Sequence, residues 1–571
     1  MRIRLTTLVL AFSWAVTVAV AGCGEEVGAT AVLTVDVVTV KAAKVMTGAS
    51  TDPVKDATAI KFTASGAGMD AVSVEYGFDA GVVGSGALPE FQVGYERQMT
   101  VELCSGTCDL EAGGTILSRG RSVLLKILEG DKTKPKTVFV APLNSFVPPS
   151  KVGETDAIET SKIIGSERVG ATVTELEDGT LLIIGGAKIK AGAKSWYRPD
   201  DIESVSNKAE IYDPQSGVFT STGILTRARS HHAAIKLGGP NKADGRVVVM
   251  GGYESKAGAF VPTMSVEIYD PVTKTFTEEP ENRWLAGAGR ALMTAGLAYP
   301  DDGVIFLAGG ISDPVDRGAW LLYQPGRGTA GAGGLTPAEV GPENGKGTPR
   351  WNHTMTFLPT YGKSAGGASI PAFVLMGGEN DLGTLSEVEA YQLDPWNGGS
   401  SSVRRDVNAV TTALPATART LHSAVYVPGQ GIVWVIGGFE DKELTRPINR
   451  VEVFRVGALS FTDGEYLDLA EARGGVSATL IETATNTVFI AGGKGAGGPL
   501  TRTEMIVETK VCQEGGGACV RQPSIVSDKT PEMDSARVGQ AAILDPTSRL
   551  LLLGGVSADN AIPDPIFYNP L

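Results

Sequence analysis

The four histidines are the side chains best suited to hold a metal ion or to transfer protons near neutral pH. They are His231, His232, His353 and His422. His232, His353 and His422 each follow an arginine by three residues, so they mark a repeated position. A repeated position favours a structural role at the start of a strand over a single ligand site. We therefore expect no metal and no other cofactor.

Seven arginines form a second set with chemical potential. Each precedes a Gly-Gly doublet by 17 to 27 residues: Arg168, Arg229, Arg290, Arg350, Arg419, Arg473 and Arg537. Because a guanidinium group offers a planar fork of donors, some of these side chains could ring a channel mouth and bind an acidic or sugar ligand. The alternative is that each arginine pairs with a glutamate of its own repeat and with nearby backbone.

One long loop, residues 187–207, combines aromatic and basic side chains. It contains Lys188, Lys190, Lys194, Trp196, Tyr197 and Arg198. Recognition surfaces are often built from such side chains on loops. We expect this loop to be the principal contact site, centred on Trp196, Tyr197 and Arg198.

The start of the chain predicts export. Arg2 and Arg4 precede a largely apolar run, residues 5–21, which is short for a membrane span. The run ends in Val-Ala-Gly-Cys at Cys23, which resembles the lipobox of bacterial lipoproteins. That resemblance implies a signal peptide over 1–22, a lipid on Cys23 and a tether over 23–30, whereas the alternative is an ordinary cleavage site. With no Asp after Cys23, similarity to enteric sorting signals implies the outer membrane, on its periplasmic or outer surface.

The remaining cysteines agree with an oxidising compartment. They form two close pairs in loop-like segments: Cys104 with Cys108, and Cys512 with Cys519. Export predicts a local disulfide in each pair. A zinc site would need four ligands at metal spacing, which two distant pairs do not provide.

Composition excludes several classes of protein. The 571 residues carry a net charge of −14, which argues against binding to nucleic acid. A hydrophobic fraction of 42% excludes a disordered chain. The 73 glycines, without a collagen period, favour a turn-rich β protein. The Gly-rich stretch 326–347 lacks a phosphate-loop pattern and is expected to be a flexible insertion.

The elements that position these residues are β-strands. Residues 31–148 alternate apolar and polar side chains in short runs, which predicts a small β-sandwich of immunoglobulin-like architecture. From there on, a glycine doublet follows an apolar run seven times, at steps of 66, 58, 68, 60, 55 and 62 residues. A strand with no polar face must be covered on both sides, so seven sheets packed around an axis are predicted.

The order Arg-x-x-His, apolar-Gly-Gly and Glu-x-Tyr-Asp-Pro resembles the kelch repeat, from residue 155 to 571. The Glu-x-aromatic element is complete in four repeats; Glu504 keeps only the acid, and the third and seventh repeats keep only Tyr323 and Tyr568. The resemblance implies an all-β protein with a seven-bladed propeller of four-stranded blades. We expect residues 157–164 to supply the missing last strand of the seventh blade, so that the ring has no open edge.

The resemblance also suggests what the protein does. Kelch galactose oxidases bind copper through two His and two Tyr, one Tyr crosslinked to a Cys. In this chain no Cys stays unpaired if the predicted disulfides form, and the His are spread among repeats, so copper chemistry is not expected. The leading hypothesis is a monomeric lipoprotein that binds a protein or glycan with one loop face of the propeller and touches the membrane only through its lipid. The alternatives are a sugar-modifying enzyme similar to the kelch mutarotases and a structural component of the bacterial envelope.

Overall fold

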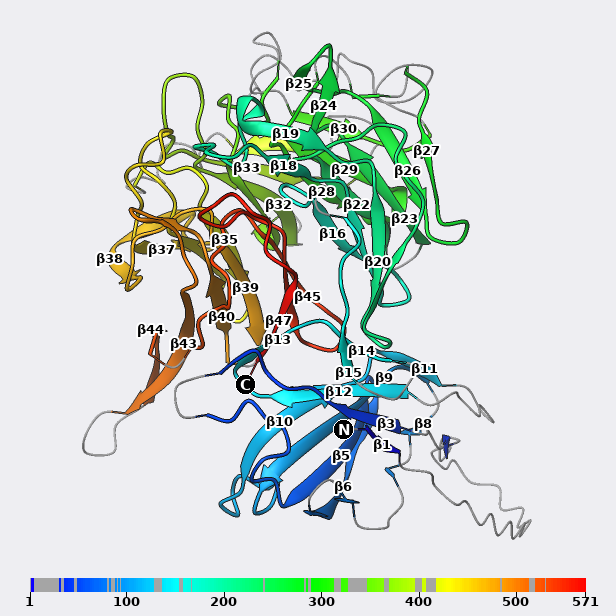
Figure 1. Ribbon diagram of the computed structural model, residues 1–571. Helices are drawn as coiled ribbons and strands as arrows, with labels where there is room; N and C mark the ends of the chain where they lie inside the picture. Colours follow the sequence, from blue (N-terminus) through cyan, green and yellow to red (C-terminus); the bar gives the residue numbers. More distant parts are fainter. Residues whose placement is uncertain are drawn as a thin grey trace, which may run out of the picture.

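The computed structural model describes residues 2–4 and most of the chain from 30 to 570. The residues outside this description are 1, 5–29, 32–34, 46–48, 80–81, 84–87, 90, 93, 128–135, 154–157, 166, 240–241, 282–283, 286–288, 313–319, 327–346, 364–368, 396–402, 407–416, 483–484, 513–518, 529 and 571. The fold is all-β, as predicted, with an N-terminal sheet below a seven-bladed propeller (Figure 1). Helical structure is sparse in the described part and includes the short 3-10 turns η1 (Pro199–Asp201) and η3 (Pro300–Asp302).

The N-terminal domain, expected as a small sandwich, is one curved sheet that forms a half-barrel. Its strands follow the order β1 (Arg2–Arg4), β3 (Val35–Thr39), β12 (Lys136–Pro142), β10 (Thr115–Arg121), β9 (Gly94–Ser105), β5 (Ala59–Gly66), β6 (Met69–Asp79) and β7 (Val82–Val83), and β11 (Leu125–Ile127) also pairs with β9. A separate ladder joins β2 (Thr30–Ala31) to β8 (Phe91–Gln92). The sheet encloses its own apolar core, in which Ile60, Phe62 and Val101 are fully buried.

Blades 1 to 4 follow in chain order. Blade 1 contains β16 (Thr172–Glu175), β17 (Leu181–Ile184), β20 (Ala209–Asp213) and β21 (Val218–Ser221). Blade 2 contains β22 (Ala233–Gly239), β23 (Lys242–Met250), β26 (Val266–Asp270) and β27 (Thr275–Glu278). The described strands of blade 3 are β28 (Thr294–Tyr299), β29 (Val304–Ala308) and β30 (Trp320–Tyr323). Blade 4 contains β31 (Thr354–Lys363), β32 (Ser369–Met376), β33 (Val388–Leu393) and β34 (Val403–Asp406).

Blades 5 to 7 complete the ring. Blade 5 contains β35 (Ser423–Val427), β36 (Ile432–Ile436), β37 (Arg450–Arg455) and β38 (Ser460–Asp468). Blade 6 contains β39 (Ser477–Glu482), β40 (Thr487–Ala491), β43 (Thr503–Cys512) and β44 (Cys519–Val526). Blade 7 contains β45 (Ala541–Leu544), β46 (Leu550–Leu553), β47 (Ile566–Asn569), β13 (Ser145–Val147) and β4 (Lys44–Val45). We call the strands of a blade a to d, from the inside outward.

The apolar b strands pack on both faces, which explains why they have no polar side. In β17, Leu182 and Ile184 contact Val247 and Val249 of blade 2. The alternate side chains of β17 contact blade 7 and the N-terminal sheet. Similar clusters fill the spaces between the other neighbouring blades. The ring is therefore held by packing between blades, as the sequence predicted.

The prediction for the strand that closes the ring is wrong. The partner of β47 is β13, with Phe146 opposite Tyr568, whereas β15 (Ile158–Thr160) pairs with β14 (Ser150–Val152). The physical reason is that this slot faces the core between blades 6 and 7, where Phe146 is fully buried against Phe489 and Tyr568. The side chains of β15 are largely exposed and could not fill that space. Figure 1 shows β13 beside β47.

The N-terminal part of the chain and the propeller share one sheet. β4 pairs with the outer side of β13, so blade 7 takes two strands from the N-terminal part of the chain. The N-terminal sheet contacts the propeller at the turns between strands a and b, where the Gln98 amide donates to Pro546 O at 3.0 Å. The face carrying the loops between strands b and c lies at the other end (Figure 1).

The predicted modification sites fall partly outside the described residues. Cys23 is one of these undescribed residues, so its lipidation stays a prediction. β1 lies within the predicted signal peptide and pairs with β3 at the edge of the sheet, so its removal would leave the other ladders intact. Cys104 and Cys108 form the predicted disulfide. The backbones of Cys512 and Cys519 lie opposite each other, but their side chains are outside the description.

Candidate functional site

The glycine doublets are the joints between blades. Gly185 and Gly186 have φ values of 60° and 111°, and a Cβ atom on Gly185 would lie 2.5 Å from Arg229 O of the next blade. The second glycine donates its N–H to that same carbonyl, at 2.9 Å. The equivalent bond recurs at Gly252, Gly310, Gly378, Gly438 and Gly493. Only glycine combines this backbone conformation with so close an approach.

The seven repeat arginines do not lie at the surface of the channel mouth. Each is at most 2% exposed. Arg229 is typical, since its guanidinium donates to Gly251 O at 2.8 Å and to Glu267 Oε1 at 2.7 Å. Glutamates at the same repeat position, Glu210, Glu389, Glu452 and Glu504, form ion pairs with the arginines of their own blades. Buried in this way, the arginines cannot meet a ligand from solvent, and the placement supports the alternative of internal pairing.

Arg537 lacks that carboxylate, because Ile566 occupies the position that glutamate holds in blade 1. Its guanidinium donates instead to Asp564 O at 3.1 Å and Leu552 O at 3.4 Å. Burial lowers the pKa of Arg537 to about 10. Its bonds are still internal, so this arginine has the same structural role.

The repeated histidines tie each blade to the one before it. The Nε2 atoms of His232, His353 and His422 lie 2.8–2.9 Å from the hydroxyls of Thr172, Thr294 and Thr354, respectively. Burial lowers the pKa of all three imidazoles, in His422 to about 3, and the neighbouring arginines add to the effect. The structural role predicted for these residues is confirmed. In the described part of the chain, no cluster of three or more His, Cys, Asp or Glu is placed to hold a metal ion.

Backbone hydrogen bonds between successive blades form a ring, which we call the inner ring. The residue two positions after each repeat arginine has a φ of 53–69° in every blade: Gly170, His231, Leu292, Asn352, Leu421, Gly475 and Gly539. Within this ring, N–H groups donate to the preceding blade from His231 to Gly170, from Leu292 to His231, from Leu421 to Asn352, from Gly475 to Leu421 and from Gly539 to Gly475. The ring joins successive blades around the axis.

A second ring, which we call the mouth ring, is formed by the residues that directly follow the doublets. Each pairs with the residue after a repeat arginine in an isolated bridge. The seven members are Ala187, Tyr253, Ile311, Glu379, Phe439, Lys494 and Val556. Only Glu379 and Lys494 carry a charge. The sequence analysis did not single out either residue, although reading the position after each Gly-Gly would have found both.

Trp196 and Tyr197 seal this mouth and are not the exposed contact residues that the sequence suggested. They are 5% and 1% exposed. They pack with Phe439, Val538 and Val556, which come from other blades. Trp196 lies on the backbone of the inner ring, since a Cβ atom on Gly539 would be 2.3 Å from its indole. Burial of the Trp196 and Tyr197 side chains removes apolar area from water, which favours the inward turn of the loop.

We call the loop 187–207 the plug loop and its segment Trp196, Tyr197 and Arg198 the plug. Arg198, the third predicted contact residue, is the exposed end of the plug. Its guanidinium donates to Lys442 O of blade 5. On the other side of the loop, the Asn560 amide of blade 7 donates to Lys190 O at 3.2 Å. The plug loop is thus fastened to two other blades, so the residues predicted to contact a ligand have an internal structural role.

Glu379 anchors the plug. Its Oε1 atom accepts bonds from the Tyr197 hydroxyl at 3.1 Å, the Trp351 indole at 2.8 Å and the Asn352 amide at 3.2 Å. Its Oε2 atom is buried without a partner. Burial raises the pKa of Glu379 above its ordinary value, and the hydrogen bonds partly oppose this. A buried acid surrounded by neutral donors holds the plug but has no path to a ligand.

Lys494, in contrast, faces an open cavity of about 500 Å³ on the same face. The walls are the loops between strands b and c of blades 5, 6 and 7, together with the stretch 192–196 of the plug loop. Burial lowers the pKa of Lys494, and Asp441 partly opposes the shift. The Lys494 side chain is half-buried, and no ion-pair partner for it lies among the described residues. This cavity is the best candidate for a binding site.

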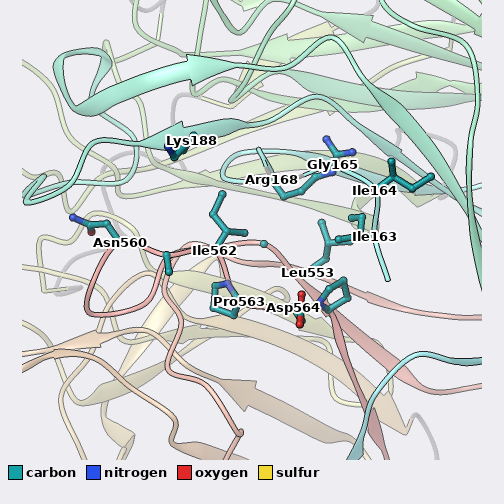
Figure 2. A pocket seen from close by; sticks show the side chains of 13 residues that line it. Ile163, Ile164, Gly165, Arg168, Lys188, Leu553, Asn560, Ile562, Pro563 and Asp564 are labelled. Atoms are coloured by element: carbon teal, nitrogen blue, oxygen red, sulfur yellow. The ribbon is translucent and has the colours of Figure 1, made fainter. Parts of the chain in front are cut away.

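A second cavity, of about 290 Å³, lies at the seam between blades 7 and 1 (Figure 2). Its two cationic lining residues already have partners: Lys188 forms an ion pair with Glu203 at 2.7 Å, and Arg168 pairs with Glu210. Ile163, Ile562 and Pro563 contribute apolar surface around it. With its cations satisfied, this cavity offers less to a charged ligand than the one at Lys494.

Comparisons with known proteins give no family assignment. No protein-family model matches the chain, and no curated protein matches its sequence. The seven-bladed arrangement is compatible with a kelch-type propeller, and the resemblance remains one of repeat pattern. In the described residues, no helix is long and apolar enough to cross a membrane.

Proposed function

We propose that the chain is a binding module for a partner protein, held at a membrane by a lipid on Cys23. The partner would meet the face that carries the loops between strands b and c, which we call the loop face. A propeller suits protein binding, and this fold agrees with the proposal. The observation that carries the choice of face is the plug, which covers the mouth ring beside the cavity at Lys494.

The arrangement of the two domains supports the same face. The N-terminal sheet covers turns at the other end of blades 6, 7 and 1. β2 starts seven residues after Cys23. A lipid there would hold the N-terminal domain near the membrane, and the loop face would point away from it (Figure 1).

Leu382 is the residue with which we would test this proposal. It lies in the loop between strands b and c of blade 4 and is 96% exposed. Exposed apolar side chains of this kind serve as anchors in protein interfaces. Val272 offers a matched control, because it is 90% exposed in the turn between strands c and d of blade 2, at the opposite face.

The test is capture of partners from an envelope extract of the source cells, using the protein without its signal peptide. We expect Leu382→Asp to lose a partner that the unchanged protein and Val272→Asp both retain. Equal capture by all three would contradict the choice of face. A glycan array run in parallel would contradict protein binding if a sugar bound the loop face and no protein did.

A further inference from the structure

Two cations, Lys194 and Lys494, line the cavity on the loop face together with two acids, Glu443 and Asp559. Of these four side chains only Lys494 is half-buried, and the others are exposed. Lys494 comes directly after the Gly492-Gly493 doublet, so its backbone is fixed by the bridge to Gly474. Its side chain is half-buried, and Asp441, the acid whose charge raises its pKa, is already engaged by Thr445 and Arg446. A partly desolvated ammonium without a carboxylate is an unfavourable arrangement that a bound anion would relieve.

The floor of the cavity is apolar. Trp196, Leu444, Val538 and Val556 line it, and each is at most 5% exposed. They belong to a single packed cluster that also includes Tyr197 of the plug. Because their positions are fixed by packing, the floor is a preformed surface for an aliphatic or aromatic group. A volume of about 500 Å³ lies within the range of ordinary ligand sites.

The uncharged polar side chains of the lining already have partners within the chain, whereas Lys194 and Glu443 are exposed at the edge of the cavity. Ser557 donates its hydroxyl to Asp559, which turns that carboxylate back onto its own turn. The Thr445 hydroxyl donates to Asp441 at 2.6 Å, and the Asn560 amide donates to Lys190 O. A sugar bound here would bury hydroxyls with few free partners, which costs binding energy. An apolar ligand with one acidic group avoids that cost.

We propose that the cavity binds an apolar stretch of the partner protein that carries one carboxylate, and that Lys494 is the ion-pair partner of this group. The inference rests on the proposed function, since it specifies what part of a protein the loop face recognises. The carboxylate is supplied either by a free C-terminus or by an acidic side chain next to aliphatic residues. Both sources present the same chemistry to the lysine.

Short peptides can separate these two sources. The probes are N-acetyl-Leu-Val-Leu with a free C-terminus, the same peptide as its amide, and N-acetyl-Leu-Asp-Leu amide. Binding is measured as protection of Lys494 from acetylation by dilute acetic anhydride, with mass spectrometry as the readout. Lys194, which is exposed at the rim of the same cavity, serves as the internal control.

We expect at least one of the two acidic peptides to slow acetylation of Lys494 and to leave Lys194 unaffected, while the neutral amide protects neither. By calorimetry, Lys494→Met should weaken binding of that peptide about tenfold or more, because a charge-assisted bond is lost. Lys194→Met should change it by no more than about twofold. Equal protection by acid and amide, protection by neither acidic peptide, or protection by the neutral disaccharide cellobiose alone, would overturn the proposal.

Failure of this inference can be told apart from failure of the proposed function. If a partner is lost with Leu382→Asp but binds Lys494→Met at full affinity, the loop face stands and the role of Lys494 is overturned. In the opposite case, an acidic peptide protects Lys494 but Leu382→Asp captures every partner as well as the unchanged protein does. The cavity is then a carboxylate site, and the proposal that the loop face binds a protein is overturned.

Discussion

The two charged members of the mouth ring, Glu379 and Lys494, occupy the same repeat position but differ in burial and in access to solvent. Glu379 of blade 4 lies under Tyr197 and is 3% exposed, whereas Lys494 of blade 6 opens onto a cavity. The propeller symmetry places both side chains at the axis, and the plug loop of blade 1 decides which one solvent can reach. A single insertion can therefore divide a symmetric ring into a structural half and a half available for binding.

The largest effect is expected from removing the Trp196 indole, which closes the part of the mouth ring that contains Glu379. Trp196→Ala should lower the free energy of unfolding by about 3–5 kcal/mol, because it deletes a buried indole that the glycine-lined wall cannot move in to replace. Urea denaturation would measure the loss. Trp284, which is only half-buried against Arg227, provides the control, and Trp284→Ala should cost clearly less. Equal losses would mean that the plug is loosely packed.

A smaller effect is expected from cutting the anchor of the plug. Tyr197→Phe removes the hydroxyl that donates to Glu379. Glu379 then keeps two of its three side-chain donors, Trp351 and Asn352. Loss of a buried hydrogen bond to a charged group should cost about 2 kcal/mol. In a Glu379→Gln background the cost should shrink, since the acceptor is then neutral. An unchanged cost in that background would show that the hydroxyl acts through packing alone.

The sequence predicts the blades correctly but not the burial of Trp196 and Tyr197, because the two depend on different features of the chain. The doublets at Gly185 and its six counterparts repeat because every joint needs the same backbone geometry, so their periodicity predicts the blades. Whether Trp196 is buried or exposed depends on the direction in which one loop turns. Aromatic side chains on a loop suit a plug as well as a contact surface. The prediction for the closing strand fails for a related reason, since β13 lies within residues 31–148, the range predicted to form a separate sandwich.

Substitution of Glu379 is expected to raise the free energy of unfolding, whereas the two substitutions above lower it. Burial raises its pKa, so the folded protein binds the proton of Glu379 more tightly than the unfolded chain does. Its contribution to stability is therefore most favourable at acidic pH and is lost as pH rises through the folded pKa. Glu379→Gln should stabilise the fold by about 1 kcal/mol at neutral pH, since the amide keeps the acceptor and carries no charge.

The pH dependence provides the control for this change. The gain from Glu379→Gln should diminish as pH falls and the native carboxyl takes up its proton. The histidines act in the other sense, because their lowered pKa values make the folded state lose stability as pH falls below the ordinary histidine value of about 6.5. That loss should appear equally in both proteins. A gain that is constant from neutral to acidic pH would contradict a raised pKa for Glu379.

The smallest effect on folding is expected at the open half of the ring. Lys494→Met removes an ammonium that has no ion-pair partner among the described residues and keeps most of the side-chain length, so the free energy of unfolding should change by no more than about 0.5 kcal/mol. Thermal and urea denaturation would measure it. A loss similar to that of Tyr197→Phe would mean that Lys494 supports the fold, in which case weaker peptide binding by this variant could be read as a packing defect. A change within that range leaves binding as the only property this lysine controls, which is the contrast with Glu379 that the mouth ring predicts.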